Sequence, residues 1–260
     1  MSKINKLKIK SARTLLLIIV YVILNIIFIP FCFIITIFLS KKQTKYFWQY
    51  FARIMYKLSF FAGNIKIKID GLEHVPSETA IFAADHRSLS DSFAFLVVIK
   101  RYFFTLTAPL EYFPWFLKIW IKKLKFINVF RDQYDEKKYN RAVIKSEAIF
   151  ETIKRLQNKE SLLIYPEGHH ERHRGVIPFH TGAVRFAIEA KVPIIPVGII
   201  GSENIITPDK HKLHPGTIHL KFGRPIYYDK YYGKLDDHEL IKKLTKELKE
   251  QVKYLINHKV

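Results

Sequence analysis

An unbroken apolar run constrains this chain more than any other feature. Residues 15–39, LLLIIVYVILNIIFIPFCFIITIFL, are 25 residues without a charged side chain. At the rise of an α-helix they extend roughly 37 Å, which is enough to cross the apolar core of a bilayer. The run is too long for a signal-peptide core, and the basic stretch SKKQTK follows it instead of a cleavage site. We therefore expect this segment to stay attached and to lie in lipid.

How the segment meets the membrane is left open by its flanks. Basic residues lie on both sides of it, so the positive-inside rule gives no orientation. Asn25 and Pro30 lie within the run. They are compatible with a re-entrant helix or hairpin as well as with a true span.

A second, amphipathic helix is predicted directly after the apolar run. Basic residues at positions 45, 53 and 57 fall between apolar residues at helical spacing. The apolar members are Phe47, Phe51, Ile54, Leu58 and Phe61. The pattern is typical of an interfacial helix with aromatic anchors, and equally of an ordinary core helix.

The charge balance predicts an anionic partner. The chain has a formal net charge of +20 and a pI near 9.8. Nucleic acid, an acidic carrier protein and a membrane surface rich in anionic lipid all fit such a balance. The only cysteine, Cys32, lies inside the apolar run, so no disulfide framework and no thiolate ligand set for zinc is expected.

From residue 64 onward the pattern is that of an α/β domain. Strands are predicted at residues 65–69 and 79–84, and a helix near Ser90, with Ser90 or Asp91 as its cap. Further strands are expected at RYFFTLTA, SLLIYP and PIIPVGII, and helices at PWFLKIWIKKL, RAVIKSEAIFETIKRL, GAVRFAIEA and residues 236–256. Such alternation favours a sheet with ligand chemistry at its strand ends. We predict two regions: a membrane-associated region of residues 1–63 and an α/β domain of residues 64–260.

The stretch DHRSLSD joins a predicted strand to a predicted helix. His86 and Asp91 are five residues apart and would not share a helix face, but a loop and a first helical turn can bring them together. Histidine has an ordinary pKa near 6.5 and serves as a general base when a carboxylate orients it. The structural alternative is that Asp91 caps the helix and His86 is an ordinary loop residue.

Three further blocks follow in order along the chain. FINVFR ends in Arg131, YPEG supplies Glu167 and Gly168 after a strand, and VPIIPV comes next. With the H-x4-D stretch, they resemble the membrane-associated glycerolipid acyltransferases, the family that contains 1-acyl-sn-glycerol-3-phosphate acyltransferase. The resemblance covers about residues 64–225.

This resemblance implies a fold, a reaction and a site. The fold would be one mixed α/β sheet flanked by helices and preceded by a membrane-anchoring segment. The enzyme would move a fatty acyl group from acyl-CoA or acyl carrier protein to lysophosphatidic acid, giving phosphatidic acid at the membrane, on the cytoplasmic face. His86 and Asp91 would be the catalytic pair, and Arg131, Glu167 and Gly168 would bind the acceptor. Neither a cofactor, a metal nor nucleic acid is expected.

The chain departs from the family pattern in two blocks. His169 and His170 stand where the third block usually continues with Thr-Arg, and Lys125 stands where the second block often opens with Gly. Arg172 or Arg174 could supply the missing charge from the same loop. The acceptor is therefore left open between lysophosphatidic acid, glycerol 3-phosphate and another lysolipid.

Two other functions are weighed beside the enzyme. His169, His173 and His180 have a tolerable spacing for zinc, but Gly and Pro around them favour a basic, solvated loop. A membrane-tethered protein that binds nucleic acid or lipid without catalysis would also be basic, yet the charge is spread along the chain and no nucleic-acid module is recognisable.

Overall fold

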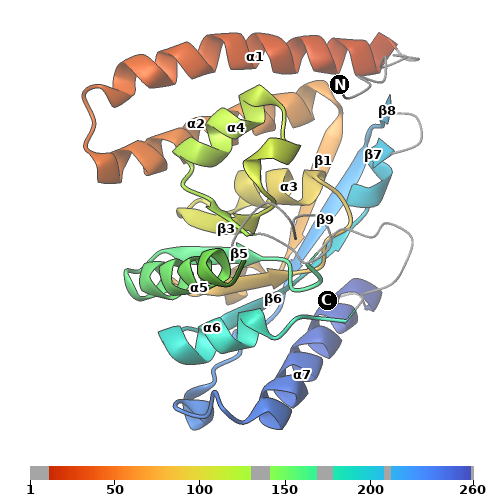
Figure 1. Cartoon of the computed structure of the whole chain (residues 1–260). Coiled ribbons are helices and arrows are strands. Elements are labelled where there is room, and N and C mark those ends of the chain that lie inside the picture. The colour runs from red at the N-terminus through yellow and green to blue at the C-terminus, as the bar shows by residue number, and fades with distance from the viewer. Residues whose placement is uncertain (1–11, 130–140, 169–177, 208–211, 259–260) are drawn as a thin grey trace. The chain divides into compact units, whose positions relative to one another are not determined.

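The computed structural model describes residues 12–129, 141–168, 178–207 and 212–258 (Figure 1). The chain divides into two compact units. The first combines segments within Met1–Lys68, Arg87–Lys100 and Ile199–Leu220, and the second combines Ile69–His86, Arg101–Gly198 and Lys221–Val260. The predicted division into residues 1–63 and 64–260 stays a prediction.

The first unit contains a helical hairpin. Helix α1 (Ala12–Thr36) is followed by α2 (Lys41–Ala62), which begins with a capping box between Ser40 and Gln43. Aromatic rings pair along the two helices in antiparallel order: Tyr21 with Tyr56, Phe28 and Phe31 with Phe51, and Phe33 with Trp48. Both helices predicted from the sequence are therefore present, and they pack on each other.

Helix α1 keeps most of its apolar surface exposed. Within the described residues, Ile19–Thr36 is the one helical stretch long and apolar enough to cross a membrane. Exposed apolar side chains of α1 include Ile19, Val22, Ile23, Ile26, Ile27, Phe31, Phe33 and Ile34. An exposed apolar surface of this size is unfavourable in water and is typical of a surface that contacts a membrane or another protein.

The remaining elements of the first unit are short. Helix α3 (Ser90–Val98) begins within the H-x4-D stretch, so that Asp91 lies in its first turn, and the 3₁₀ turn η3 (Ser202–Asn204) follows a strand. Strands β7 (Ile206–Thr207) and β8 (Lys212–Leu213) form an antiparallel pair.

Seven strands form one sheet in the order β1-β9-β6-β2-β5-β3-β4. They are β1 (Ile65–Asp70), β2 (Ile81–Ala84), β3 (Phe103–Thr107), β4 (Ile127–Asn128), β5 (Ser161–Ile164), β6 (Ile194–Ile200) and β9 (Gly216–Phe222). Strand β2 pairs in parallel with β5 and β6, and β3 pairs in parallel with β5 and β4. The predicted α/β class with a mixed sheet and flanking helices is confirmed.

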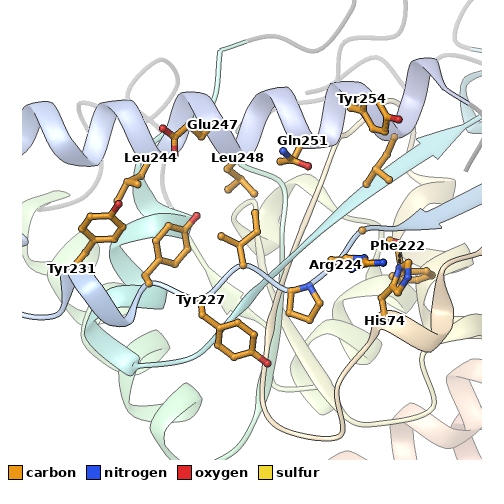
Figure 2. A pocket seen from close by; sticks show the side chains of 15 residues that line it. His74, Phe222, Arg224, Tyr227, Tyr231, Leu244, Glu247, Leu248, Gln251 and Tyr254 are labelled. Atoms are coloured by element: carbon orange, nitrogen blue, oxygen red, sulfur yellow. Dashed lines mark hydrogen bonds between the residues drawn. The ribbon is translucent and has the colours of Figure 1, made fainter.

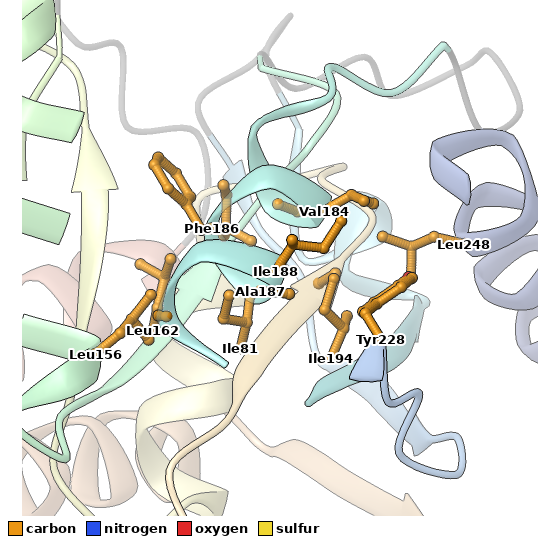
Figure 3. Close-up of a cluster of buried hydrophobic side chains, with 14 of the residues drawn as sticks. Ile81, Leu156, Leu162, Val184, Phe186, Ala187, Ile188, Ile194, Tyr228 and Leu248 are labelled. Atoms are coloured by element: carbon orange, nitrogen blue, oxygen red, sulfur yellow. The ribbon is translucent and has the colours of Figure 1, made fainter. Parts of the chain in front are cut away.

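Helices α5 (Arg141–Gln157), α6 (Gly182–Ala190) and α7 (His238–Asn257) of the second unit pack on these parallel strands. The second unit also contains α4 (Trp115–Lys123) and 3₁₀ turns at Leu72–His74 (η1), Leu110–Tyr112 (η2) and Asp229–Tyr231 (η4). Figure 3 shows Val184 and Ile188 of α6 packed over Ile81 and Ile194, with Leu248 of α7 beside Tyr228. Every residue of β2 and β5 is buried, as expected of strands covered on both faces.

The parallel pairing places the ends of β2 and β5 together. Ala83 is in register with Ile164, so the chain leaves both strands at the same edge of the sheet. In parallel α/β sheets ligands bind outside the carboxyl ends of the strands. The segments that follow β2 and β5 are therefore where a site is expected, and they carry His86 and the YPEG block.

Candidate active site

His86 comes two residues after the end of β2 and is half-buried. Its imidazole stacks on the ring of Tyr165, with ring centroids 4.0 Å apart and planes inclined by 17°. Its backbone N–H donates a hydrogen bond of 3.2 Å to Oε2 of Glu167. The first and third blocks of the sequence pattern therefore meet in the folded chain.

The YPEG block is a tight turn that follows β5. The N–H of Gly168 donates to the carbonyl of Tyr165 at 2.9 Å, and Gly168 has φ 81°, a left-handed conformation that favours glycine. The N–H of His180 donates to the carbonyl of Pro166 at 2.8 Å. Glu167 is 4% exposed, so the turn directs its carboxylate into the protein, where it accepts from the His86 amide.

Asp91 belongs to the first unit and is fully buried. Its Oδ2 accepts hydrogen bonds of 2.8 Å from the backbone N–H groups of Arg87 and Ser88. The Arg87 amide belongs to the peptide group that joins His86 to Arg87. The carboxylate thus holds the backbone immediately after the histidine in one conformation.

The prediction that Ser90 or Asp91 caps the following helix is wrong. The N-cap of α3 is Leu89, and no side chain caps it. The carboxylate of Asp91 turns back to amides that precede the helix, because two charge-assisted hydrogen bonds are available there. This geometry removes helix capping as the explanation for Asp91.

Two serines support the same segment; the sequence predicted no role for Ser88, and for Ser90 only that of a helix cap. Ser88 and Ser90 are buried. The Ser90 hydroxyl is 3.0 Å from the Ser88 hydroxyl and 3.3 Å from the carbonyl of Ser202, to which it donates. Tyr165 was missed as well, although its place directly before Pro-Glu-Gly at a strand end was a usable signal.

Several predicted positions lie outside the described residues. Among them is Arg131, which comes three residues after the end of β4 in the chain. The others are His169, His170, Arg172, His173 and Arg174. In the part of the chain that the structure describes, no three His, Cys, Asp or Glu side chains are grouped so that they could hold a metal ion.

A cavity of ≈ 610 Å³ lies elsewhere in the second unit, between α7 and the segment that follows β9 (Figure 2). Leu244, Leu248 and Tyr228 form part of its apolar wall, and Arg224 and Glu247 lie at its rim. None of the residues predicted for the site lines it. This cavity is therefore separate from the candidate active site.

The local geometry defines what this strand end can do chemically. A half-buried imidazole lies where parallel strands present ligands, with an aromatic ring on one face. The carboxylates of Glu167 and Asp91 fix the backbone on which it is carried. Such a histidine is suited to remove and return a proton.

Comparison with known proteins adds independent information. The family profile described as Acyltransferase matches residues 66–200, which is more than half of the chain. The chain is 41% identical over 71 residues to 1-acyl-sn-glycerol-3-phosphate acyltransferase of Escherichia coli, covering 27% of this chain and 28% of that protein. It is 26% identical over 174 residues to the enzyme of the same name from Cocos nucifera, covering 66% of this chain and 53% of that one.

A yeast relative and a solved structure also match the chain. The chain is 26% identical over 185 residues to 1-acyl-sn-glycerol-3-phosphate acyltransferase of Saccharomyces cerevisiae, covering 67% of this chain and 56% of the relative. The matches thus span about half the length of these two eukaryotic relatives, and less of the bacterial one. The crystal structure of PlsC from Thermotoga maritima, titled a 1-acyl-sn-glycerophosphate (LPA) acyltransferase, aligns with a TM-score of 0.71 at 20% identity, covering 95% of this chain and 98% of that one.

The structural likeness supports the fold, and the profile match covers the segment that holds both the H-x4-D stretch and the YPEG turn. The chain belongs to the acyltransferase family.

Proposed function

We propose that this protein transfers a fatty acyl group from an acyl thioester to the free hydroxyl of lysophosphatidic acid, giving phosphatidic acid. Relatives from bacteria, plants and yeast carry names for this activity. The observation that carries the proposal is the placement of His86. It lies after a parallel strand, and its own amide and the next two amides are all bound by carboxylates.

In the proposed reaction His86 is the general base. It takes the proton of the acceptor hydroxyl as the oxygen attacks the thioester carbonyl, and a tetrahedral oxyanion forms. Collapse of this intermediate breaks the carbon–sulfur bond, and the imidazolium returns the proton to the departing thiolate. The products are an ester and a free thiol. No serine nucleophile is needed, because the acceptor alcohol takes that part.

Asp91 stabilises the imidazolium and selects the tautomer of His86 in this proposal. Its fully buried carboxylate is held by the amides of Arg87 and Ser88, so it is pre-organised rather than mobile. A negative charge fixed in advance costs no reorganisation when positive charge develops on the imidazole.

Arg131, Glu167 and Gly168 are proposed to form the acceptor end of the site. An arginine offers a planar fork for a phosphate group, and the glycine turn allows close approach to the backbone. Glu167 contributes by holding the His86 segment, since its carboxylate accepts from the His86 amide. Arg131→Ala should then raise KM for the acceptor with a smaller change in kcat.

The α1–α2 hairpin is proposed as the membrane attachment. Helix α2 packs antiparallel on α1 and carries basic residues that a bilayer core does not accept, among them Lys45 and Lys57. The packing therefore favours a hairpin at one surface over a span by α1 alone. We place the catalytic part on the cytoplasmic face, where basic residues meet anionic lipid.

A different acceptor is the second candidate. His169 and His170 replace the usual Thr-Arg next to the glycine turn, which changes the charge available to a phosphate group. The candidates are glycerol 3-phosphate and other lysophospholipids.

The identifying experiment offers radiolabelled acyl-CoA and acyl-acyl carrier protein, separately, to the purified protein with a panel of acceptors. Selective labelling of phosphatidic acid supports the proposal and names the donor. Labelling of another lipid assigns the second candidate. No labelling with any pair would favour a lipid-binding protein without catalysis.

A further inference from the structure

Arg53 of α2 binds the carboxyl end of α3. Its Nε donates to the carbonyl of Leu96 at 3.1 Å, and its Nη2 donates to the carbonyls of Ile99 at 2.7 Å and Lys100 at 2.8 Å. The last carbonyls of a helix have no partner within the helix. A guanidinium there satisfies them and opposes the negative end of the helix dipole. Burial lowers the pKa of Arg53, so its charge is partly withdrawn from water to make this contact.

A second contact joins the same helices one turn further along α2. The ring of Tyr56 stacks on that of Phe93 of α3, with centroids 4.0 Å apart and planes inclined by 14°. The hydroxyl of Tyr56 lies 3.3 Å from that of Tyr21 on α1. Helix α3 is therefore attached at two places to the hairpin that we propose as the membrane attachment.

The opposite end of α3 carries Asp91. The helix is nine residues long, roughly 13 Å, and backbone hydrogen bonds between successive turns connect its two ends. Its first turn holds the carboxylate that binds the amides of Arg87 and Ser88. A shift at the carboxyl end of α3 is thus transmitted to the proposed catalytic carboxylate.

We propose that Arg53 is a positioning residue, which locks α3 to the membrane-binding hairpin and thereby sets the position of Asp91. The inference rests on the proposed function, because it takes Asp91 as a catalytic group and α1–α2 as the membrane attachment. It adds that the helices that attach the enzyme to lipid also determine where the Asp91 carboxylate lies. A displacement of about 1 Å in a catalytic group can lower turnover by about a hundredfold.

The test compares Arg53→Ala and Arg53→Lys with a matched control, Arg101→Ala. Arg101 also donates to backbone carbonyls, those of Pro76 and Glu78, and burial lowers its pKa as well, but neither of these partners belongs to α3. Two readouts are taken on the full chain bound to vesicles containing phosphatidylglycerol. One is hydrogen exchange of the amides of residues 87–91, and the other is steady-state kinetics with lysophosphatidic acid.

In Arg53→Ala we expect the amides of residues 87–91 to exchange about tenfold faster or more, with vesicle binding unchanged. We expect kcat to fall by about ten- to a hundredfold and the acceptor KM to stay within about twofold. Arg53→Lys should lie between, and Arg101→Ala should match the wild type in all readouts.

Unchanged exchange at residues 87–91 would overturn the inference whatever the activity. Equal acceleration in Arg101→Ala would overturn it too, because the effect would then be general loosening. Faster exchange with wild-type kcat would show that α3 is held by Arg53 without positioning a catalytic group, which also overturns it. If the wild type transfers no acyl group, the proposed function fails, while the exchange comparison still decides whether Arg53 holds the Asp91 segment.

Discussion

At the scale of single residues, three consecutive backbone amides are held by carboxylates. The amide of His86 donates to Glu167, and those of Arg87 and Ser88 donate to Asp91. Both carboxylates are buried, so hydrogen bonds to them are stronger than on the surface. The conformation that presents His86 is therefore determined by charge-assisted hydrogen bonds that a mutation can remove singly.

Replacing Asp91 by Asn separates two roles of this side chain: holding the backbone amides and stabilising the imidazolium of His86. The Asn oxygen can still accept from the Arg87 and Ser88 amides, so we expect stability to fall by only about 1 kcal/mol. Turnover should fall by roughly 10³- to 10⁴-fold, because the neutral amide cannot stabilise an imidazolium. Thermal unfolding and initial rates measure the two effects. Asp237→Asn is the control, since its carboxylate accepts only from the Leu240 amide at the start of α7 among the contacts described; a similar rate loss there would contradict the account.

Two substitutions of Glu167 separate the effect of its hydrogen bond from the effect of its charge. Glu167→Ala leaves the His86 amide without its acceptor and should lower the free energy of unfolding by about 1–3 kcal/mol. Glu167→Gln keeps an acceptor oxygen and should stay within about 1 kcal/mol of the wild type, with most of its activity. Chemical denaturation and kcat are measured on both variants. If Gln proves as damaging as Ala, the charge and not the hydrogen bond is what the site requires.

At the scale of elements, the α1–α2 hairpin has an apolar surface that the described part of the chain does not cover. Ile26 is 64% exposed and Ile27 is 56% exposed, although both lie in the middle of α1. Aromatic pairs instead fill the contact between the two helices. The exposed side of α1 is therefore available for lipid.

The proposed membrane role of this surface is testable by substitution. Ile26→Lys should weaken binding to anionic vesicles by about tenfold or more, because each apolar side chain moved out of water contributes roughly 1.5–3 kcal/mol. Flotation with vesicles measures the binding, and Leu72→Lys, at a 40% exposed position in η1, is the control. Wild-type protein should withstand high salt and be released by detergent. Release by salt alone would mean an electrostatic tether in place of an embedded hairpin.

At the scale of the whole molecule, the alternation of strands and helices could be read from the sequence. Predicted strands at 65–69, 79–84, RYFFTLTA, SLLIYP and PIIPVGII correspond to β1, β2, β3, β5 and β6, and the last predicted helix corresponds to α7. These segments have clear apolar periodicity or continuous apolar runs. Strand β9 was missed, although Ile218, Leu220 and Phe222 alternate along it and are buried.

What the sequence did not predict depends on contacts between distant residues. Nothing local shows that Arg53 reaches carbonyls of residues 96–100, since the partners are more than 40 positions away. The prediction that Ser90 or Asp91 caps α3 was wrong, because a capping aspartate and one that turns back to earlier amides have the same local sequence. The His86 and Glu167 contact followed only once the parallel pairing of β2 with β5 was known.

The net charge of +20 also acts at this scale. A positive charge of this size favours association with anionic lipid surfaces, and the attraction weakens as salt screens it. Under the proposed function, a membrane lipid explains this charge more simply than nucleic acid does.

The central claim is that His86 removes the proton of the acceptor hydroxyl, and one comparison tests it most directly. Phosphatidic acid formation from lysophosphatidic acid and the accepted acyl thioester is measured for wild type, His86→Ala and His74→Ala. His74 is the control because its Nδ1 lies 3.1 Å from the carbonyl of Phe222, at the cavity of Figure 2. We predict a loss of about 10²- to 10⁴-fold in His86→Ala with folding retained, and near wild-type rates in His74→Ala. A folded His86→Ala enzyme that turns over at the wild-type rate would contradict the account.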